Sequence, residues 1–209
     1  MSKTKLIHLF RHAEAQHNAA ARTMGSEESY RHPDHIDARL TADGVGQCVS
    51  ARCMPEVDMI VSSTLTRAVQ TAHLLYPDAV SNRGSMLLTD LARERHIASH
   101  VCNHRLNLAT LRDFWRHPVI GATDEDPYPQ MDSETDEEAH DRAMRLVDML
   151  KTMKGDRIAV FTHATFMFSL FHALDPVNHP FWRIASQDYS RALFYSQCAT
   201  FELVIPDSQ

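Results

Sequence analysis

The feature that most constrains the fold is a set of three short apolar runs, each followed at once or soon after by polar and charged residues. The runs cover residues 6–10, 57–61 and 157–161. Runs of this length between segments of helical pattern are typical of buried parallel strands. The chain is therefore predicted to form an α/β fold in which helices and strands make separate layers.

Start and stop signals place helices between these strands. We predict helices over residues 41–53, 62–75, 133–153 and 163–174, and a last strand over residues 197–205. The predicted N-terminal caps are Thr41 or Asp43, Ser62 or Ser63, and Ser133, since side chains of these types accept hydrogen bonds from the first free N–H groups of a helix.

The length of 209 residues and the 44% hydrophobic content fit one domain with its own core, over residues 1–209. Residues 95–133 show no clear periodicity, and the part from 121 to 133 is acidic and contains proline. We interpret residues 95–133 as an insertion that could act as a lid.

Composition disfavours several classes of function. The formal net charge of −6 gives little attraction for a phosphate backbone, so we expect no nucleic-acid partner. No apolar run reaches the roughly 18 residues that a membrane span needs, and residues 1–10 do not resemble a signal peptide. The 4 cysteines are scattered, as is typical of reduced thiols, so we expect a cytoplasmic protein.

Cationic and imidazole side chains follow the three predicted strands. Arg11 and His12 come directly after the first strand, Arg67 soon after the second, and His163 directly after the third. Ligands of open α/β sheets bind beyond the carboxyl ends of parallel strands, so these side chains should converge. Helix N-termini opened by Ser63 and His163 should add backbone N–H groups there.

This combination suits a phosphate ester. Arginine binds phosphate oxygens through a planar pair of donors and keeps its charge. A neutral histidine nitrogen can attack phosphorus, while the other cations stabilise the charge that develops on the oxygens. A leaving alkoxide needs a proton, for which Glu94 is the candidate acid.

Four segments resemble, in order, the motifs of the histidine phosphatase superfamily, the phosphoglycerate mutase-like proteins. They are residues 11–14 with Asn18, residues 40–47, residues 62–72 and residues 160–164. Ala13, Ala15, Thr162 and Ala164 depart from the residues that are common in that family. These departures leave the phosphate-pocket residues in place and predict changes in specificity or rate.

The resemblance implies a mixed, mostly parallel sheet between helices, with an insertion that shapes substrate choice. It implies that His12 takes the phosphoryl group and that Arg11, Arg67 and His163 complete the phosphate pocket. It further implies that Asn18 contacts phosphate, that Glu94 donates the proton, and that no metal or other cofactor is needed. Glu14 is expected to have a structural role.

The predicted function is a metal-independent phosphatase acting on a small phosphate ester or a phosphopeptide through a phosphohistidine on His12. Two alternatives are a phosphoglycerate-type mutase and a catalytically weak module that binds phosphorylated ligands. A basic rim would suit a polyanion, and an apolar rim would suit an aromatic ester. The candidate residues are Arg93, Arg95 and Arg105 for the basic rim, and Phe114, Trp115 and Trp182 for the apolar rim.

One further run, from His96 to His104, contains three histidines and a cysteine. Histidines spaced by four residues can share a zinc ion on a helix, but a second ligand cluster at a standard spacing is missing. We therefore favour the interpretation that this run lines the mouth of the pocket.

Overall fold

The computed structural model describes residues 3–51, 54–78, 85–174 and 198–205, the last of these as backbone only. Within these residues a sheet of six strands has the order β4-β3-β2-β5-β1-β6. The strands are β1 (Lys3–Arg11), β2 (Met59–Ser63), β3 (Met86–Thr89), β4 (Val119–Ile120), β5 (Arg157–Thr162) and β6 (Cys198–Ile205). The five strands from β4 to β1 run parallel, and β6 is antiparallel to β1. This confirms the predicted mixed, mostly parallel α/β fold.

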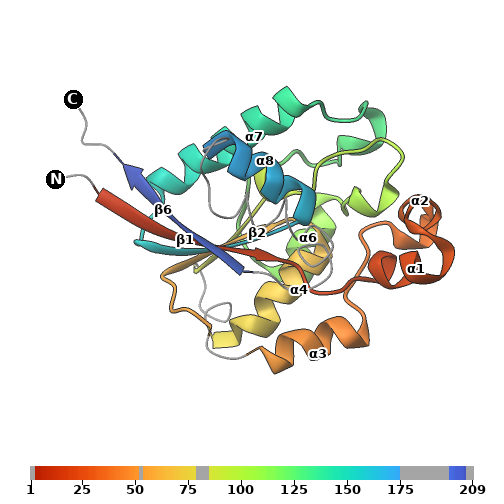
Figure 1. Ribbon diagram of the computed structural model, residues 1–209, viewed down its shortest axis with the longest axis horizontal. Coiled ribbons are helices and arrows are strands. Elements are labelled where there is room, and N and C mark those ends of the chain that lie inside the picture. Colours follow the sequence, from red (N-terminus) through yellow and green to blue (C-terminus); the bar gives the residue numbers. More distant parts are fainter. Residues whose placement is uncertain (1–2, 52–53, 79–84, 175–197, 206–209) are drawn as a thin grey trace.

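Helices cover both faces of the sheet (Figure 1). They are α1 (Gln16–Met24), α2 (Ser26–Arg31), α3 (Ala42–Ser50), α4 (Thr66–Leu75), α6 (Leu108–Trp115), α7 (Asp136–Thr152) and α8 (Ala164–Leu174). Short 3₁₀ turns add η1 (Pro33–His35), η2 (Asp90–Ala92), η3 (Val101–Asn103) and η4 (Tyr128–Gln130). In the described residues, no helix is both long and apolar enough to cross a lipid bilayer.

Alternation along the strands explains the two layers of core. Ile7 and Leu9 of β1 pack with α7 and α8, whereas Phe10 packs with α4 on the opposite face. Successive side chains of a strand point to opposite faces, so each buried strand contributes side chains to both hydrophobic cores. Phe161 of β5 stacks on Phe10 with ring centroids 4.9 Å apart, which joins β1 to its neighbour beneath the end of the strands.

The helix predicted over residues 62–75 begins later than expected. Ser62 and Ser63 belong to β2, where they pair in register with Leu88 and Thr89 of β3, and both are fully buried. Helix α4 starts at Thr66, whose backbone N–H and hydroxyl donate to the Asp37 carboxylate at 2.8 and 2.7 Å. The prediction that Ser63 opens this helix was therefore wrong, because an acidic residue distant in sequence takes the capping role.

The start of the long helix also moves. Thr135, not Ser133, accepts the hydrogen bond from the Glu138 N–H at 3.2 Å, and Glu138 accepts one from the Thr135 N–H in return. This reciprocal capping box satisfies two free donors and begins α7 at Asp136. The Ser133 hydroxyl instead accepts a hydrogen bond from the N–H of Ala98.

Regular structure occurs within the predicted insertion. Residues 95–133 contain η3, α6, β4 and η4, and β4 extends the sheet beside β3. The sequence pattern did not reveal β4 because it has only two residues. Whether this segment moves as a lid stays a prediction.

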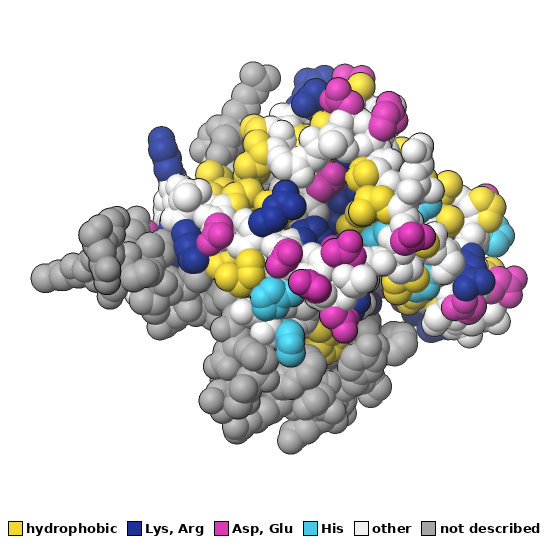
Figure 2. Space-filling view, turned by 90° about the horizontal axis from the view of Figure 1, so that it is seen from above, with side chains coloured by type: hydrophobic (Ala, Val, Ile, Leu, Met, Phe, Trp, Pro, Cys, Tyr) yellow, Lys and Arg dark blue, Asp and Glu magenta, His cyan; other side chains and the backbone are white. Residues whose placement is uncertain are grey.

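The described surface mixes charges of both signs. Figure 2 looks down on the face that carries α7 and shows acidic and basic side chains interspersed, without a large region of one sign.

Candidate active site

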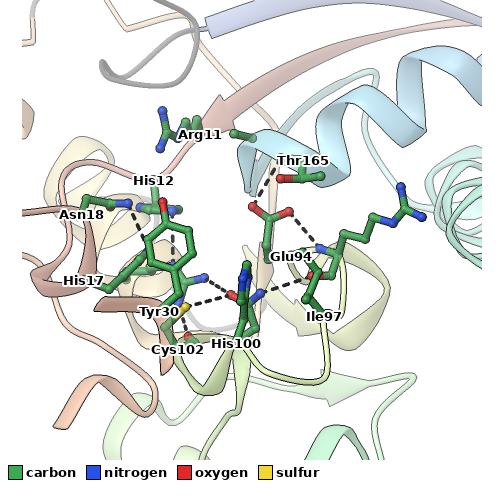
Figure 3. Close-up of a pocket in the computed structure, with 14 residues that line it drawn as sticks. Arg11, His12, His17, Asn18, Tyr30, Glu94, Ile97, His100, Cys102 and Thr165 are labelled. Atoms are coloured by element: carbon green, nitrogen blue, oxygen red, sulfur yellow. Dashed lines mark hydrogen bonds between the residues drawn. The ribbon is translucent and has the colours of Figure 1, made fainter. Parts of the chain in front are cut away.

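A pocket of about 480 Å³, counting its open mouth, lies at the carboxyl end of β1 (Figure 3). It is lined by two arginines and one histidine from the motif segments (Arg11, Arg67 and His12) together with side chains of α1, α2, the residues that follow η2, η3 and the start of α8. The lining residues are Arg11, His12, His17, Asn18, Tyr30, Arg67, Glu94, Arg95, Ile97, His100, Cys102, Asn103, Ala164 and Thr165. Five of the six predicted site residues therefore share one pocket.

His12 is held in one orientation. Its Nδ1 lies 2.7 Å from the carbonyl oxygen of Ala13, which can only accept, so Nδ1 carries the proton. Its Nε2 accepts a hydrogen bond from the Nε–H of Arg67 at 3.2 Å. Burial, reinforced by the charges of Arg67 and Arg11, holds the pKa of His12 well below its ordinary value. The ring is therefore neutral, with the lone pair on Nε2.

Arg67 lines the pocket and is 1% exposed. Besides His12, its guanidinium donates to the carbonyl oxygen of Cys102 at 2.7 Å and to Oδ1 of Asn103 at 3.0 Å. Burial lowers the pKa of Arg67 and of Arg11, yet both guanidinium groups stay charged at neutral pH. The N–H groups of Arg67 that remain are available to an anion.

His163 lies beside His12 but is not among the residues that line the pocket. The two rings are 5.0 Å apart between centroids, and Nε2 of His163 lies 2.8 Å from the Ser63 hydroxyl. Its Nδ1 is buried without a hydrogen-bond partner among the described residues. Burial and the charge of Arg67 place the pKa of His163 well below its ordinary value, so this ring is also neutral.

Asn18 lines the pocket, and its side chain orders the loop after β1. Its Oδ1 accepts from the N–H of Ala15 at 3.1 Å, and its Nδ2 donates to Nε2 of His17 at 3.1 Å. Glu14 points elsewhere: it pairs with Arg22 and accepts from the Thr41 hydroxyl at 2.8 Å. These contacts fit the structural role predicted for Glu14.

Glu94 sits at the start of α8. Its Oε1 accepts from the N–H groups of Arg95 and Phe166, each at 2.8 Å, and its Oε2 from that of Thr165 at 3.3 Å. Figure 3 shows this carboxylate directed toward Thr165. The prediction that the N-terminus of α8 offers these amides to a phosphate was wrong, because the protein's own carboxylate binds them. Asp37 takes the N–H of Thr66 at α4 in the same way.

The predicted basic rim does not form. Arg93 and Arg105 are 0% and 4% exposed, with Arg93 paired to Asp126 at 2.7 Å and Arg105 to Asp90 at 3.1 Å. Arg95 lines the pocket, but its guanidinium binds Asp136 at 2.6 Å and the carbonyl oxygen of Glu134 at 3.0 Å. These pairings turn the cations into structural links.

The two described residues of the predicted apolar rim do not line this pocket. Phe114 and Trp115 line a separate cavity with Arg39, Thr66, Gln70 and Leu106. Trp182 lies outside the described residues.

The run from His96 to His104 does not form a metal cluster in the described part of the chain, where no group of three or more candidate ligands gathers. The His96 ring lies 4.2 Å from that of Tyr128, and its Nε2 donates to the carbonyl oxygen of Met131 at 3.1 Å. His100 and Cys102 line the pocket, as the alternative interpretation predicted.

Residues 7–196 match the sequence profile of the histidine phosphatase superfamily, branch 1. The chain belongs to this superfamily. The match covers most of the chain and includes every motif segment quoted above, so the order of the pocket residues along the chain is that of a histidine phosphatase.

Known proteins agree with this assignment. Phosphoglycerate mutase-like protein 1 of Arabidopsis thaliana is 26% identical over 216 residues, covering 86% of this chain and 75% of that protein. A phosphoglycerate mutase structure from Bacillus anthracis superposes with a TM-score of 0.57 at 15% identity, covering 100% and 93% of the two chains. A mycobacterial glucosyl-3-phosphoglycerate phosphatase gives 0.54 at 18%, covering 96% and 91%. The two structures share their fold with this chain.

Several pocket residues of this superfamily member were missed from sequence. His17 could have been predicted as a pocket residue, because it adjoins the candidate Asn18 in the sequence. In the structure both belong to α1, and the ring of His17 lies 6.0 Å from that of His12. Tyr30 and Ile97 had none, since they reach the pocket from α2 and from the loop that follows η2 only after the chain folds.

Proposed function

We propose that this protein is a metal-independent phosphatase that hydrolyses phosphomonoesters through a phosphohistidine on His12. The observation that carries the proposal is the state of His12, whose Nδ1 proton is held by the Ala13 carbonyl while Nε2 keeps its lone pair inside a cationic pocket. A neutral imidazole whose lone pair faces a pair of arginines is suited to attack a bound phosphate.

Binding of the ester comes first. Arg11, Asn18 and the unused N–H groups of Arg67 hold the phosphate oxygens, with Arg67 exchanging its contact to His12 for one to the anion. His163 stabilises an equatorial oxygen of the phosphate. Two observations support this role: its ring lies beside that of His12, and its buried Nδ1 has no hydrogen-bond partner among the described residues. Stabilisation of the developing charge in a site sheltered from water then lowers the barrier.

Phosphoryl transfer proceeds in two balanced steps. In the first, which requires Glu94 in its carboxylic acid form, Nε2 of His12 forms a bond to phosphorus, the ester P–O bond breaks, and the leaving oxygen takes the proton of Glu94, which becomes a carboxylate. In the second, a water oxygen attacks phosphorus, the P–N bond breaks, and the Glu94 carboxylate takes the proton of the water. The Oε2 atom of Glu94 has the longer of the contacts to backbone N–H groups and is our candidate for the proton-transfer atom.

The test is hydrolysis of a generic aryl phosphate in EDTA by the wild type, His12→Ala and His172→Ala. His172 is an exposed histidine near the end of α8 and serves as the matched control. We expect activity in EDTA, a loss of about 10³-fold or more in His12→Ala, and wild-type rates in His172→Ala. Mass spectrometry after an alkaline quench should find a phosphate on His12. Activity that depends on metal, or that persists without His12, contradicts the proposal.

Glu94 has its own test, which compares esters of different leaving groups. Glu94→Gln should lower kcat for an alkyl phosphate by about 10²-fold, because a poor leaving group needs the proton, and lower it much less for an aryl phosphate. An equal loss for both esters would remove Glu94 from the role of proton donor and leave the phosphohistidine step standing.

The relatives named as mutases make phosphoglycerate a necessary substrate to examine. Transfer of phosphate between hydroxyls of phosphoglycerate, without release to water, would identify the mutase. A higher Tm with phosphate or vanadate, together with no turnover of any ester, would identify a binding module.

The cytoplasmic location is part of the proposal and is supported by the free thiols of Cys48 and Cys102.

A further inference from the structure

Aromatic rings form one wall of the pocket. Tyr30 of α2 stands edge to face with His17 at 5.3 Å between centroids and with His100 at 5.0 Å. The interplanar angles are 70° and 82°. We call His17, Tyr30 and His100 the aromatic wall. All three residues line the pocket, and Figure 3 shows the Tyr30 ring in front of His12 and toward His100.

The aromatic wall begins next to the nucleophile. The ring of His17 lies 6.0 Å from that of His12, and the row continues through Tyr30 to His100. In-line attack by His12 directs the ester oxygen away from His12 and toward Glu94, the proposed proton donor. Glu94, Tyr30 and His100 line the same pocket, so the group bonded to that oxygen can lie against the Tyr30 and His100 end of the wall. Ile97, half-buried, lines the same pocket and adds an apolar contact.

The rings of the aromatic wall are uncharged at neutral pH. Burial lowers the pKa of His17 well below its ordinary value, and that of His100 less strongly. Burial raises the pKa of Tyr30, so its hydroxyl keeps its proton. Neutral rings pack against another aromatic ring edge to face, as they already do against each other.

A second anionic group would find little to bind in the described pocket. Arg93 and Arg105 are buried in pairs with Asp126 and Asp90, and the guanidinium of Arg95 is paired with Asp136. Arg11 and Arg67 are committed to the phosphate in the proposed mechanism. A substrate with an additional carboxylate or phosphate would therefore lose water around that charge without gaining a counter-ion.

Resting on the proposed function, we infer that the alcohol half of the substrate carries an aromatic ring close to the ester oxygen and no second anionic group. The ring lies against the aromatic wall, with Tyr30 as its main contact, while the phosphate occupies the cationic floor. Tyr30 and His100 are thus specificity residues and not catalytic ones.

The decisive comparison uses benzyl phosphate and cyclohexylmethyl phosphate. The two esters have similar size and similar leaving groups and differ in aromaticity. We expect the wild type to show a KM for benzyl phosphate about 3- to 10-fold lower, with similar kcat, since an aromatic pair contributes this much beyond buried area. Glucose 1,6-bisphosphate and 3-phosphoglycerate should give lower kcat/KM than either ester.

Variants locate the effect. Tyr30→Leu should remove the difference in KM between the two esters, and Tyr30→Phe should keep it because the ring remains. His100→Ala should reduce the difference and gives a second readout in case Tyr30→Leu does not fold, which circular dichroism checks. Equal KM values in the wild type, or a difference that survives in Tyr30→Leu, would overturn the inference.

The outcome separates the two proposals. Hydrolysis that requires His12 but shows no aromatic preference would contradict only the aromatic wall. Hydrolysis that persists in His12→Ala would contradict the phosphohistidine mechanism itself. A higher kcat/KM for the bisphosphate or for phosphoglycerate would overturn the substrate class inferred here and leave the nucleophile in place.

Discussion

The guanidinium of Arg67 both links separate parts of the fold and contacts His12, the proposed nucleophile. Its three hydrogen bonds run to His12, to the carbonyl oxygen of Cys102 and to Asn103, and so join α4 to the chain around η3. Asn103 in turn donates to the carbonyl oxygen of Arg95 at 3.2 Å. A planar fork of donors is needed to reach three partners in different directions.

Arg67→Lys keeps the charge and loses the fork. An ammonium group cannot reach all three acceptors, so buried oxygens of Cys102 and Asn103 lose a donor. We expect kcat/KM to fall about 10²-fold and the free energy of unfolding to fall by about 1–3 kcal/mol. Steady-state kinetics and urea unfolding measure the two effects. Arg112→Lys, at an exposed position of α6, should change neither; a wild-type rate in Arg67→Lys would refute the need for the fork.

At this scale the sequence predicted which residues share the pocket better than it predicted their surroundings. Arg11, His12 and Arg67 were predictable as pocket residues because each lies at or soon after the end of a strand, and these strands end at the same edge of the sheet. The burial of Arg93 and Arg105 could not be predicted, because they contact their partners Asp126 and Asp90 only in the folded chain. Charge density in the sequence does not tell a solvated arginine from a paired one.

Among the elements, α3 holds the loop that follows β1. The Thr41 N–H donates to the carbonyl oxygen of Glu14 at 3.0 Å, and Gln47 accepts from the Glu14 N–H at 2.9 Å. Between them, Gly44 lets the helix approach so closely that an added Cβ would overlap the Glu14 carbonyl oxygen. Glu14 is two residues from His12, so this contact helps to position the proposed nucleophile.

Two glycines of α3 make a matched pair for substitution. Gly44→Ala should push the loop away, lowering the free energy of unfolding by about 1–3 kcal/mol and reducing kcat/KM. Gly46→Ala, where nothing lies within 4 Å of the new Cβ, should stabilise the helix by about 0.5–1 kcal/mol. Chemical denaturation and kinetics of both variants test this; equal effects at the two positions would show that the close approach is unimportant.

The elements themselves were predicted where apolar runs were long. Helices α7 and α8 and strand β5 fall close to their predicted positions because four or more apolar residues define each. The short strands β3 and β4 were missed, and Ser62 and Ser63 were taken for helix caps. Serine after an apolar run fits both a strand end and a cap, and only the pairing with β3 decides between them.

The whole molecule carries histidines that folding keeps uncharged. The pKa values of His12, His17 and His163 are all lowered well below 6.5, with burial as the largest cause. Below pH ~6.5 the unfolded chain protonates these side chains while the folded protein does not. The unfolded state then binds more protons, so stability must fall as the pH falls.

We therefore expect the free energy of unfolding to be largest above pH ~7 and to decrease from pH 7 to pH 5, by up to about 1.4 kcal/mol per pH unit for each buried histidine. Asp37, whose pKa burial raises, titrates in the opposite sense and offsets only part of this loss. Urea unfolding at pH 8, 7, 6 and 5 measures the slope. His17→Gln should make it shallower, whereas a flat or rising profile would contradict the neutral state of these rings.

At the scale of the whole molecule, motif order was enough to predict the family and the sheet, but not the wall of the pocket. Tyr30 and His100 come from segments with no motif, 70 positions apart, and meet only because α2 packs against η3. The substrate preference that we infer therefore depends on long-range packing, which a single sequence does not display.

The contact between Arg67 and His12 has one more consequence for the proposed mechanism. In the structure, the nitrogen proposed to attack phosphorus already accepts an N–H of its neighbour. Under the proposed mechanism, an incoming dianion would draw that guanidinium toward itself and so uncover the attacking atom. An uncharged electrophile of the same shape would exert no such pull, and the same contact would then shield the histidine from reagents that are not phosphates.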